Sequence, residues 1–199
     1  MRILVFFFSI VVFFNSSVQS FALDVSDFCS YLSSIQALKA NFVEIIDGKK
    51  NEGVIFLKKP ERVLIDYRKG DIAAKIAING KKVVFLDKKA EQITHLEHGF
   101  YNFFHIFSDD KLCKSGFVGI ENNDLCIIDL YNQQKYRVCF DLKDDNTEML
   151  IKIDLIYGDK NVEKFVNYSE IKLIKIRKNI DLSNDIFNLR DPRLFKNEF

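Results

Sequence analysis

Three histidines in one short segment are the residues with the clearest potential for chemistry. His95, His98 and His105 lie in the stretch THLEHGFYNFFH, and Glu97 stands between the first two. A zinc site on a helix usually spaces two histidines four residues apart, so that both rings lie on one face. His98 and His105 are seven residues apart, and no further ligand follows at a recognisable spacing. The segment therefore predicts neither a metal site nor a cofactor.

Catalytic nucleophiles have no recognisable setting in this chain. The G-x-S-x-G pattern that presents a hydrolase serine is absent, and Ser108 and Ser115 have no evident histidine and acid partners. The paired carboxylates Asp109-Asp110 and Asp144-Asp145 sit in polar segments that are typical of solvated turns. No glycine-rich phosphate loop is present. The sequence indicates a protein that is not an enzyme.

The first residues have the three-part layout of a secretory signal. A short positive start precedes an apolar run that reaches Phe14, and small polar residues follow it. A transmembrane helix needs about 20 apolar residues, which is longer than this run. We expect export and cleavage near Ser20 or Ala22, which makes residues 1–22 the signal peptide and residues 23–199 the mature domain.

The charge of the mature chain argues against a nucleic-acid partner. Removal of the signal takes away one basic residue and no acidic one, which leaves 28 of each and a formal charge of zero. Nucleic-acid binding needs a basic surface that neutralises phosphates. A lipid held by burial has no such requirement. The length that remains fits one domain with a sizeable core.

The four cysteines leave the disulfide pattern open. Cys29, Cys113, Cys126 and Cys139 would meet an oxidising compartment after export, and four cysteines allow three pairings. Buried free thiols are an equal alternative, because cysteines in strands often behave as small hydrophobic residues. No C-x-x-C spacing is present, so a metal or redox site is not indicated.

Alternation of apolar and polar residues runs through most of the mature chain. Such a period of two indicates strands with one face toward a core and one toward water. No helical pattern separates successive strands, which favours an antiparallel meander over a βαβ fold. The alternating apolar positions include Leu38, Ala40 and Phe42; Ile55 and Leu57; Val63, Ile65 and Tyr67; Ala74, Ile76 and Ile78; Tyr136, Val138 and Phe140; and Met149, Ile151, Ile153, Leu155 and Tyr157.

Turn chemistry separates these segments. Asn79-Gly80 is a strong hairpin signal, because both residues tolerate a positive φ. Asp47-Gly48, Lys69-Gly70 and Gly158-Asp159 are also expected to lie between strands. Pro60 lacks an amide hydrogen and is expected at a strand end.

Two segments carry helical spacing instead. Residues 24–35 place apolar side chains at i, i+4 and i+7, with Ser26 available as an N-cap. Residues 98–107 place four phenylalanines on one stripe. The sheet must close on itself as a barrel or be covered by these helices as a lid, and ligand sites favour such geometry. The stripe consists of Phe100, Phe103, Phe104 and Phe107.

Several ordered segments resemble the periplasmic outer-membrane lipoprotein carrier family, LolA. Their order and spacing match best over residues 25–95, and behind the predicted signal peptide they form a recognisable set. Near the end of the chain, Phe187-Asn188-Leu189 is similar to the terminal aromatic strand segment of the family. The matching text is Leu38-Lys39-Ala40-Asn41-Phe42, Gly53 through Lys58-Lys59-Pro60 to Tyr67, Asn79-Gly80-Lys81, Val83-Val84-Phe85-Leu86-Asp87 and Gln92-Ile93-Thr94.

The resemblance implies a fold and a role. The fold is mainly β with short α-helices, an unclosed antiparallel β-barrel with a helical lid over an apolar cavity. The role is that of a periplasmic, monomeric carrier that binds the acyl chains of lipoproteins. Its implied partners are acylated lipoproteins, an inner-membrane lipoprotein-releasing ABC transporter and an outer-membrane lipoprotein receptor.

The resemblance also implies site residues. The family has an arginine before the proline that ties the lid shut through hydrogen bonds to lid backbone, and Lys59 stands at that position. Lysine donates to carbonyl groups but lacks the planar fork of arginine, and Arg62 is a second candidate for the latch. The family tryptophan further along this strand is replaced by Ile65. The expected cavity lining is Leu38, Ala40, Phe42, Ile55, Leu57, Val63, Ile65 and Tyr67, with Phe100, Phe103, Phe104 and Phe107 from the lid.

Three other functions compete with the carrier. A periplasmic lipid-binding sensor or regulatory domain of the same fold is the main alternative, although such sensors carry a second domain. A periplasmic hydrolase would need a nucleophile motif. A purely structural β-domain would have a fully packed interior, whereas a carrier should show an apolar void under its lid.

Overall fold

A computed structural model describes residues 25–80, 82–97, 118–121, 124–131, 134–142, 147–159 and 162–195. The predicted signal peptide, residues 1–22, and the predicted helix of residues 98–107 lie outside these ranges. No helix within them is both long enough and apolar enough to span a membrane. The elements are α1 (Val25–Ser34), β1 (Ala37–Ile46), β2 (Lys49–Lys58), β3 (Arg62–Lys69), β4 (Ala74–Asn79), β5 (Lys82–Asp87), β6 (Gln92–Glu97), β7 (Val118–Glu121), β8 (Asp124–Tyr131), β9 (Gln134–Leu142), β10 (Met149–Asp159), β11 (Val162–Lys178) and the 3-10 helices η2 (Asn184–Phe187) and η3 (Pro192–Phe195).

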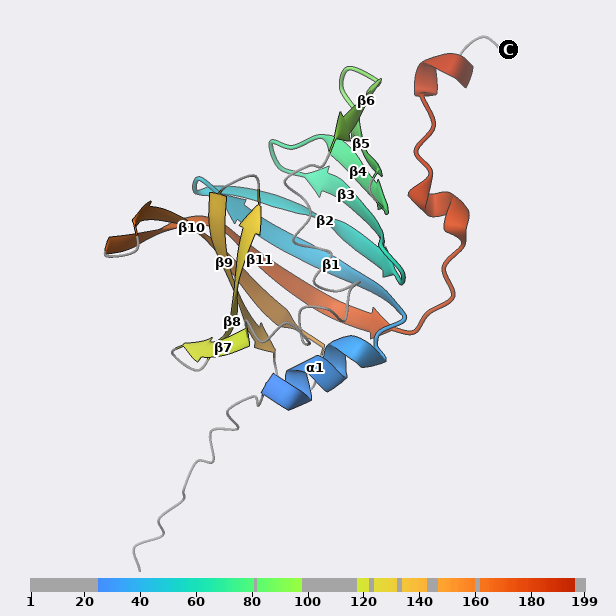
Figure 1. Cartoon of the computed structure of the whole chain (residues 1–199). Helices are drawn as coiled ribbons and strands as arrows, with labels where there is room; N and C mark the ends of the chain where they lie inside the picture. Colours follow the sequence, from blue (N-terminus) through green and yellow to red (C-terminus); the bar gives the residue numbers. More distant parts are fainter. Residues whose placement is uncertain are drawn as a thin grey trace, which may run out of the picture.

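The described strands form one antiparallel sheet. Its order is β6-β5-β4-β3-β2-β1-β11-β10-β9-β8-β7, so the first strand pairs with the last in the middle of the sheet. Every other pair of neighbours is consecutive along the chain. β6 and β7 are the two edges and are not paired with each other, which leaves the sheet unclosed (Figure 1). The predicted fold class, mainly β with an unclosed antiparallel barrel, is confirmed, and α1 is the one α-helix among the described residues.

One face of the sheet, which we call the inner face, carries the main core. It is the face on which Leu38, Ala40 and Phe42 of β1 lie. Its apolar cluster gathers residues from both halves of the sheet, for example Val83 of β5 and Ile127 of β8. One cluster with members this far apart in the strand order requires the sheet to curve around it. The period-two alternation predicted from the sequence therefore corresponds to the inside and outside of a half-barrel.

The opposite face, the outer face, is covered in part by the chain that follows β11. Leu182 and Phe187 are buried against Leu64 and Ala77 in a second, smaller cluster. Figure 1 shows this C-terminal segment passing beside the half of the sheet that holds β3 to β5. Phe187 ends the 3-10 helix η2, so the prediction that Phe187-Asn188-Leu189 is a strand segment was wrong. The segment uses its apolar side chains for packing and makes no ladder with the sheet.

Three of the four predicted turns lie between strands. Asp47-Gly48 joins β1 to β2 with φ of +49° and +74°, and Gly80 follows β4 with φ of +60°. Gly70 follows β3 with φ of +107°, where an added Cβ would lie 2.4 Å from Asn51 Oδ1. Gly158-Asp159 instead forms the end of β10, and that turn prediction was wrong. The helix α1 begins at Val25, so Ser26 lies in its first turn and not at the N-cap.

The cysteines of the described strands and of α1 are disulfide-bonded. Cys126 and Cys139 face each other on β8 and β9 and form one bridge. Cys29 of α1 is also in a disulfide, whose partner lies outside the described residues. The sequence left the pairing open, and the cross-strand register of β8 and β9 decides the first of the two bonds.

Candidate ligand-binding face

The predicted cavity residues share one side of the molecule. All eight positions from the strands belong to the inner-face cluster, and each is 5% exposed or less. The four phenylalanines Phe100, Phe103, Phe104 and Phe107 lie outside the described residues. The structure therefore brings together the strand part of the predicted lining, which is Leu38, Ala40, Phe42, Ile55, Leu57, Val63, Ile65 and Tyr67.

Helix α1 packs on the inner face through its apolar stripe. Phe28, Leu32 and Ile35 are spaced i, i+4 and i+7, and all are buried in the inner-face cluster. The Phe28 ring lies 5.1 Å from the Phe140 ring of β9, measured between centroids. The helix also contacts β7. It thus spans from the start of β1 toward the opposite edge of the half-barrel (Figure 1).

Polar bonds hold the C-terminal end of α1. The Lys59 ammonium donates to the carbonyl oxygens of Leu32 at 3.0 Å and Ser33 at 3.5 Å. A cation at this end of a helix also interacts favourably with the helix dipole. The amide of Lys59 donates to the carbonyl of Gln36 at 2.9 Å. The residue that the family resemblance assigned to the latch therefore contacts helix backbone, although the helix is α1.

Asn179 joins the same end of α1 to the end of β11. Its side-chain oxygen accepts the Gln36 amide hydrogen at 2.8 Å, and its side-chain nitrogen donates to the Ser34 carbonyl at 3.1 Å. Its own amide donates to the Ala37 carbonyl. These bonds satisfy carbonyl and amide groups that the helix end leaves without partners. Sequence reasoning did not find Asn179, because its partners lie more than 140 residues earlier.

Arg62 does not join this latch. It is the first residue of β3 and pairs with Lys58 and Asn79, and the alternation that turns Val63 inward turns Arg62 outward. Lys58 shows the same outward direction, since its ammonium donates to the Leu182 carbonyl on the outer face. The prediction that Arg62 contributes to the latch is not supported, because α1 packs on the other side of the sheet.

Burial of the Tyr31 hydroxyl opposes the docking of α1 on the sheet. This hydroxyl is buried and has no hydrogen-bond partner among the described residues. Burial raises the pKa of Tyr31 to about 12. The Lys178 ammonium lies 4.5 Å from the centre of its ring, on the side of β11. A buried hydroxyl without a partner costs about 1–3 kcal/mol, so α1 is held less firmly than its apolar area alone would give.

Three residues in a row across β1, β2 and β3 shape the inner face further along. Phe42 pairs with Gly53, which pairs with Tyr67. A Cβ on Gly53 would lie 2.6 Å from the Phe42 ring and 2.3 Å from the Asp66 carbonyl oxygen. The missing side chain lets the Phe42 ring lie over β2, where it meets the Tyr67 ring edge-on at 5.2 Å between centroids.

The two rings lead to a buried carboxyl that sequence reasoning missed. Glu44 follows Phe42 on the same face of β1 and is 6% exposed. The Tyr67 hydroxyl donates to its Oε2 at 2.8 Å, and the Ser169 hydroxyl of β11 contacts Oε1 at 3.4 Å. Burial raises the pKa of Glu44, and these two hydrogen bonds oppose that rise. The burial of Glu44 could have been predicted from the alternation of β1, because Glu44 is the next alternate residue after Leu38, Ala40 and Phe42.

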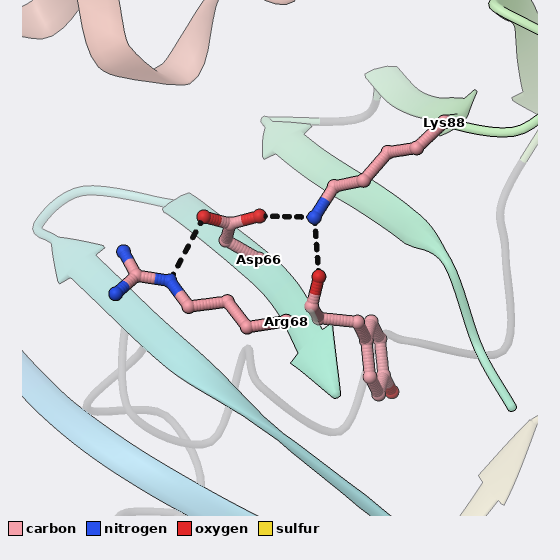
Figure 2. Close-up of polar contacts among 4 residues, drawn as sticks. Asp66, Arg68 and Lys88 are labelled. Atoms are coloured by element: carbon pink, nitrogen blue, oxygen red, sulfur yellow. Dashed lines mark hydrogen bonds and ion pairs between the residues drawn. The ribbon is translucent and has the colours of Figure 1, made fainter. Parts of the chain in front are cut away.

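An ion-pair network fixes the main chain of Tyr67 from the outer face. The Lys88 ammonium lies 2.7 Å from Asp66 Oδ1 and also donates to the Tyr67 carbonyl. Arg68 approaches the second Asp66 oxygen at 3.3 Å, as Figure 2 shows. Partial burial raises the pKa of Asp66, but the hydrogen bonds and charges of Lys88, Lys75 and Arg68 bring it below its usual value. Tyr67 is thus held at its backbone, its ring and its hydroxyl.

A small cavity adjoins Glu44 and Tyr67. Its volume is about 10 Å³, which is space for the centre of about one water molecule. An acyl chain needs far more room. This cavity by itself therefore cannot hold an acyl chain. The remaining lining consists of Phe42, Ile55, Ile65, Ile171 and Leu173.

The histidine segment contributes no metal site to the described residues. His95 is exposed on the edge strand β6, and His98 and His105 lie outside the described ranges. Within those ranges, no three His, Cys, Asp or Glu side chains lie close enough together to hold a metal ion.

Comparisons with known proteins give fold likenesses at low similarity. The sequence matches no protein-family model. It also matches no curated protein. An uncharacterised conserved protein from Thermus thermophilus matches 86% of this chain and 95% of its own, with a TM-score of 0.45 and 8% identity.

Two other solved structures have likenesses of the same kind. A DUF1329 family protein from Desulfovibrio piger matches 84% of this chain and 95% of its own, with a TM-score of 0.45 and 11% identity. A LolA superfamily protein from Nitrosomonas europaea matches 83% of this chain and 97% of its own, with a TM-score of 0.41 and 8% identity. Likenesses at this level carry no conclusion about function.

Proposed function

We propose that this protein is a periplasmic carrier that binds the acyl chains of lipoproteins on the inner face of its half-barrel. The observation that supports the proposal most is the combination of a continuous apolar face and a helix held over it by a few polar bonds. The ordered resemblance of residues 25–95 to the lipoprotein carrier family points to the same role. In this role the protein takes lipoproteins from an inner-membrane ABC transporter and delivers them to an outer-membrane receptor.

The free-energy cost of exposing an acyl chain to water explains why such a face is needed. Burial of one methylene contributes about 0.8 kcal/mol, so a chain of about 16 carbons would cost on the order of 13 kcal/mol to leave in water. A soluble carrier must bury most of that chain. The inner face offers apolar side chains from strands on both sides of the central β1–β11 pair.

Delivery also requires that the ligand can leave. Helix α1 covers part of the face with Phe28 and Leu32, and its C-terminal end is tied by Lys59 and Asn179. When a ligand displaces the helix, apolar contacts between helix and sheet are exchanged for contacts between ligand and sheet. The net affinity therefore stays moderate, because only the difference between the two sets of contacts counts.

Site-specific photo-cross-linking in cells tests the proposal. Tyr136 of β9 packs half-buried at the margin of the inner-face cluster, and Ile128 of β8 is exposed on the outer face. A photoreactive phenylalanine analogue at position 136 should cross-link to acylated lipoproteins, and the same group at position 128 should not. Native mass spectrometry of the purified protein should detect the bound lipoprotein.

The outcomes separate a carrier from a plain β-domain. Cross-linking from position 136 should disappear when the lipoprotein is produced without its acyl chains. No cross-link from position 136, equal cross-links from both positions, or cross-links that do not depend on acylation would overturn the proposal.

A further inference from the structure

The inner face carries a carboxyl that a purely apolar site would not need. Glu44 is buried in the inner face between β2 and β11, and its hydrogen-bond partners are two hydroxyls, from Tyr67 and Ser169. Within the described ranges no lysine or arginine forms an ion pair with it. An ionised carboxylate has about four acceptor positions, so two hydroxyls leave part of its capacity unused.

The register of the sheet builds this arrangement. Glu44 pairs with Asn51 on β2 and with Ile171 on β11. Tyr67 reaches it from β3, the next strand beyond β2, and Ser169 reaches it from two residues before Ile171 on β11. A bulge in β11 opposite Ile153 and Asp154 lets Tyr168 pack toward the inner-face cluster next to Ser169. The carboxyl and its two donors therefore come from β1, β3 and β11, which are three strands of the sheet centre.

The small cavity places this carboxyl beside apolar side chains. Glu44 and Tyr67 supply the polar part of its lining, and the rest is aliphatic or aromatic. Apolar pockets with a few convergent polar groups usually use those groups to fix the orientation of a ligand. A chain that runs along the inner face past Ile55 and Ile65 would bring its polar end to Glu44.

We propose that Glu44 selects the polar group of the bound amphiphile: it accepts a hydrogen bond from an uncharged or cationic donor, such as an amide N–H, and it rejects a free fatty-acid carboxylate. This inference rests on the proposed function and names the ligand class of the same face. An amide next to the chain can fill an unused acceptor position of Glu44. A carboxylate must either face a like charge at short range in a poorly solvated site or take up a proton.

Competition with a neutral dye tests the inference on the mature protein. Nile red bound to the inner face is displaced at pH 8 by palmitamide, methyl palmitate or palmitate, which share one chain and differ at its end. Wild-type protein should bind palmitamide about tenfold more tightly than palmitate. Methyl palmitate, which is uncharged but has no donor, should fall between them.

One variant and one control assign the effect to the carboxyl. Glu44→Gln should raise the affinity for palmitate about tenfold and change that for palmitamide little, because the amide side chain carries no charge. Glu170→Gln removes a half-buried acid of β11 next to Ser169 and should leave all three affinities unchanged.

Each result has a defined meaning. Equal binding of palmitamide and palmitate by the wild type, or an unchanged ratio in Glu44→Gln, would overturn the role of Glu44 while leaving acyl-chain binding intact. Failure of the dye and of all three ligands to bind would overturn the proposed function itself, and this inference with it.

Discussion

The Lys59 ammonium lies 3.0 Å from the carbonyl oxygen of Leu32, where helix α1 ends. The two residues come from the turn after β2 and from the helix that covers the inner face. Lys58, the neighbour of Lys59, donates to Leu182 on the outer face. Adjacent lysines thus tie two different segments to opposite sides of one sheet.

Lys59→Leu should loosen the docking of α1 on the inner face. Loss of charged hydrogen bonds to helix carbonyls at a partly exposed site should cost the docked helix about 1 kcal/mol. Amide hydrogen exchange of α1 should then rise about fivefold. Lys58→Leu is the matched control and should leave α1 exchange unchanged. Equal exchange in wild type and Lys59→Leu would remove Lys59 from this role.

Gly53→Ala should destabilise the protein by about 1–3 kcal/mol, the usual range for overpacking. The new methyl group would meet the Phe42 ring and the Asp66 backbone at distances that real Cβ atoms do not adopt. Urea denaturation measures the loss. Gly48→Ala is a useful comparison, because an added Cβ there would have no atom within 4 Å and only the positive φ is strained. A Gly53→Ala protein as stable as wild type would contradict the packing of these rings.

Glu44→Gln should gain stability relative to wild type as the pH rises. Burial raises the folded-state pKa of Glu44 above its ordinary value of 4.5, so the folded state binds more protons than the unfolded state at intermediate pH. The stability that wild type has below pH 4.5 is therefore lost as the pH rises through the folded pKa. The glutamine variant has no such loss.

Thermal melts of both proteins between about pH 4 and pH 8 measure this difference. The groups that face Glu44 are Tyr67, Ser169 and Tyr168, and the pKa of Tyr168 is itself raised by burial and by the Glu44 charge. The pKa of Tyr168 is moved further above this range and the Ser169 hydroxyl does not titrate within it, so neither group masks the effect. A melting-temperature difference that is constant across the range would mean that Glu44 titrates normally.

Removal of the Cys126–Cys139 bridge should lower stability without affecting the inner face. The bond joins residues 13 apart in sequence, and closing a loop of this size contributes about 3 kcal/mol through the unfolded state. The double variant Cys126→Ser, Cys139→Ser should show this loss in urea denaturation. Its affinity for Nile red should stay at the wild-type value, because Leu125 and Ile127 turn inward while Cys126 turns outward. A large loss of dye binding in a folded variant would contradict that separation.

The sequence predicted the strands well because their signal is local. In β1, Leu38, Ala40 and Phe42 alternate with polar neighbours, and that pattern alone gives both the strand and its buried side. Asp47-Gly48 and Asn79-Gly80 predicted turns for an equally local reason, the positive φ that glycine and its neighbour tolerate. Gly158-Asp159 misled because a glycine can also lie in the end of a strand.

The candidate site was predicted only in part. Lys59 was found through the family resemblance. It is expected to point to the inner face because Leu57, two residues earlier, does so. Arg62 was assigned to the same latch, although it pairs with Lys58 and both side chains point to the outer face. Glu44 was missed because a charged residue near a strand end is usually solvated. Only its partners on β3 and β11 show that it is buried and bonded.

The chain by itself determined which segments form strands, where many of them turn, and which side chains share a face, since all of these depend on neighbours in sequence. The tertiary structure alone decided that β1 pairs with β11. That pairing brings Ser169 to Glu44 across 125 residues and Asn179 to Ser34 across 145. The reason is that any strand exposes the same backbone donors and acceptors at its edge, so the choice of a distant partner depends on how the whole apolar face is buried and not on any local pattern.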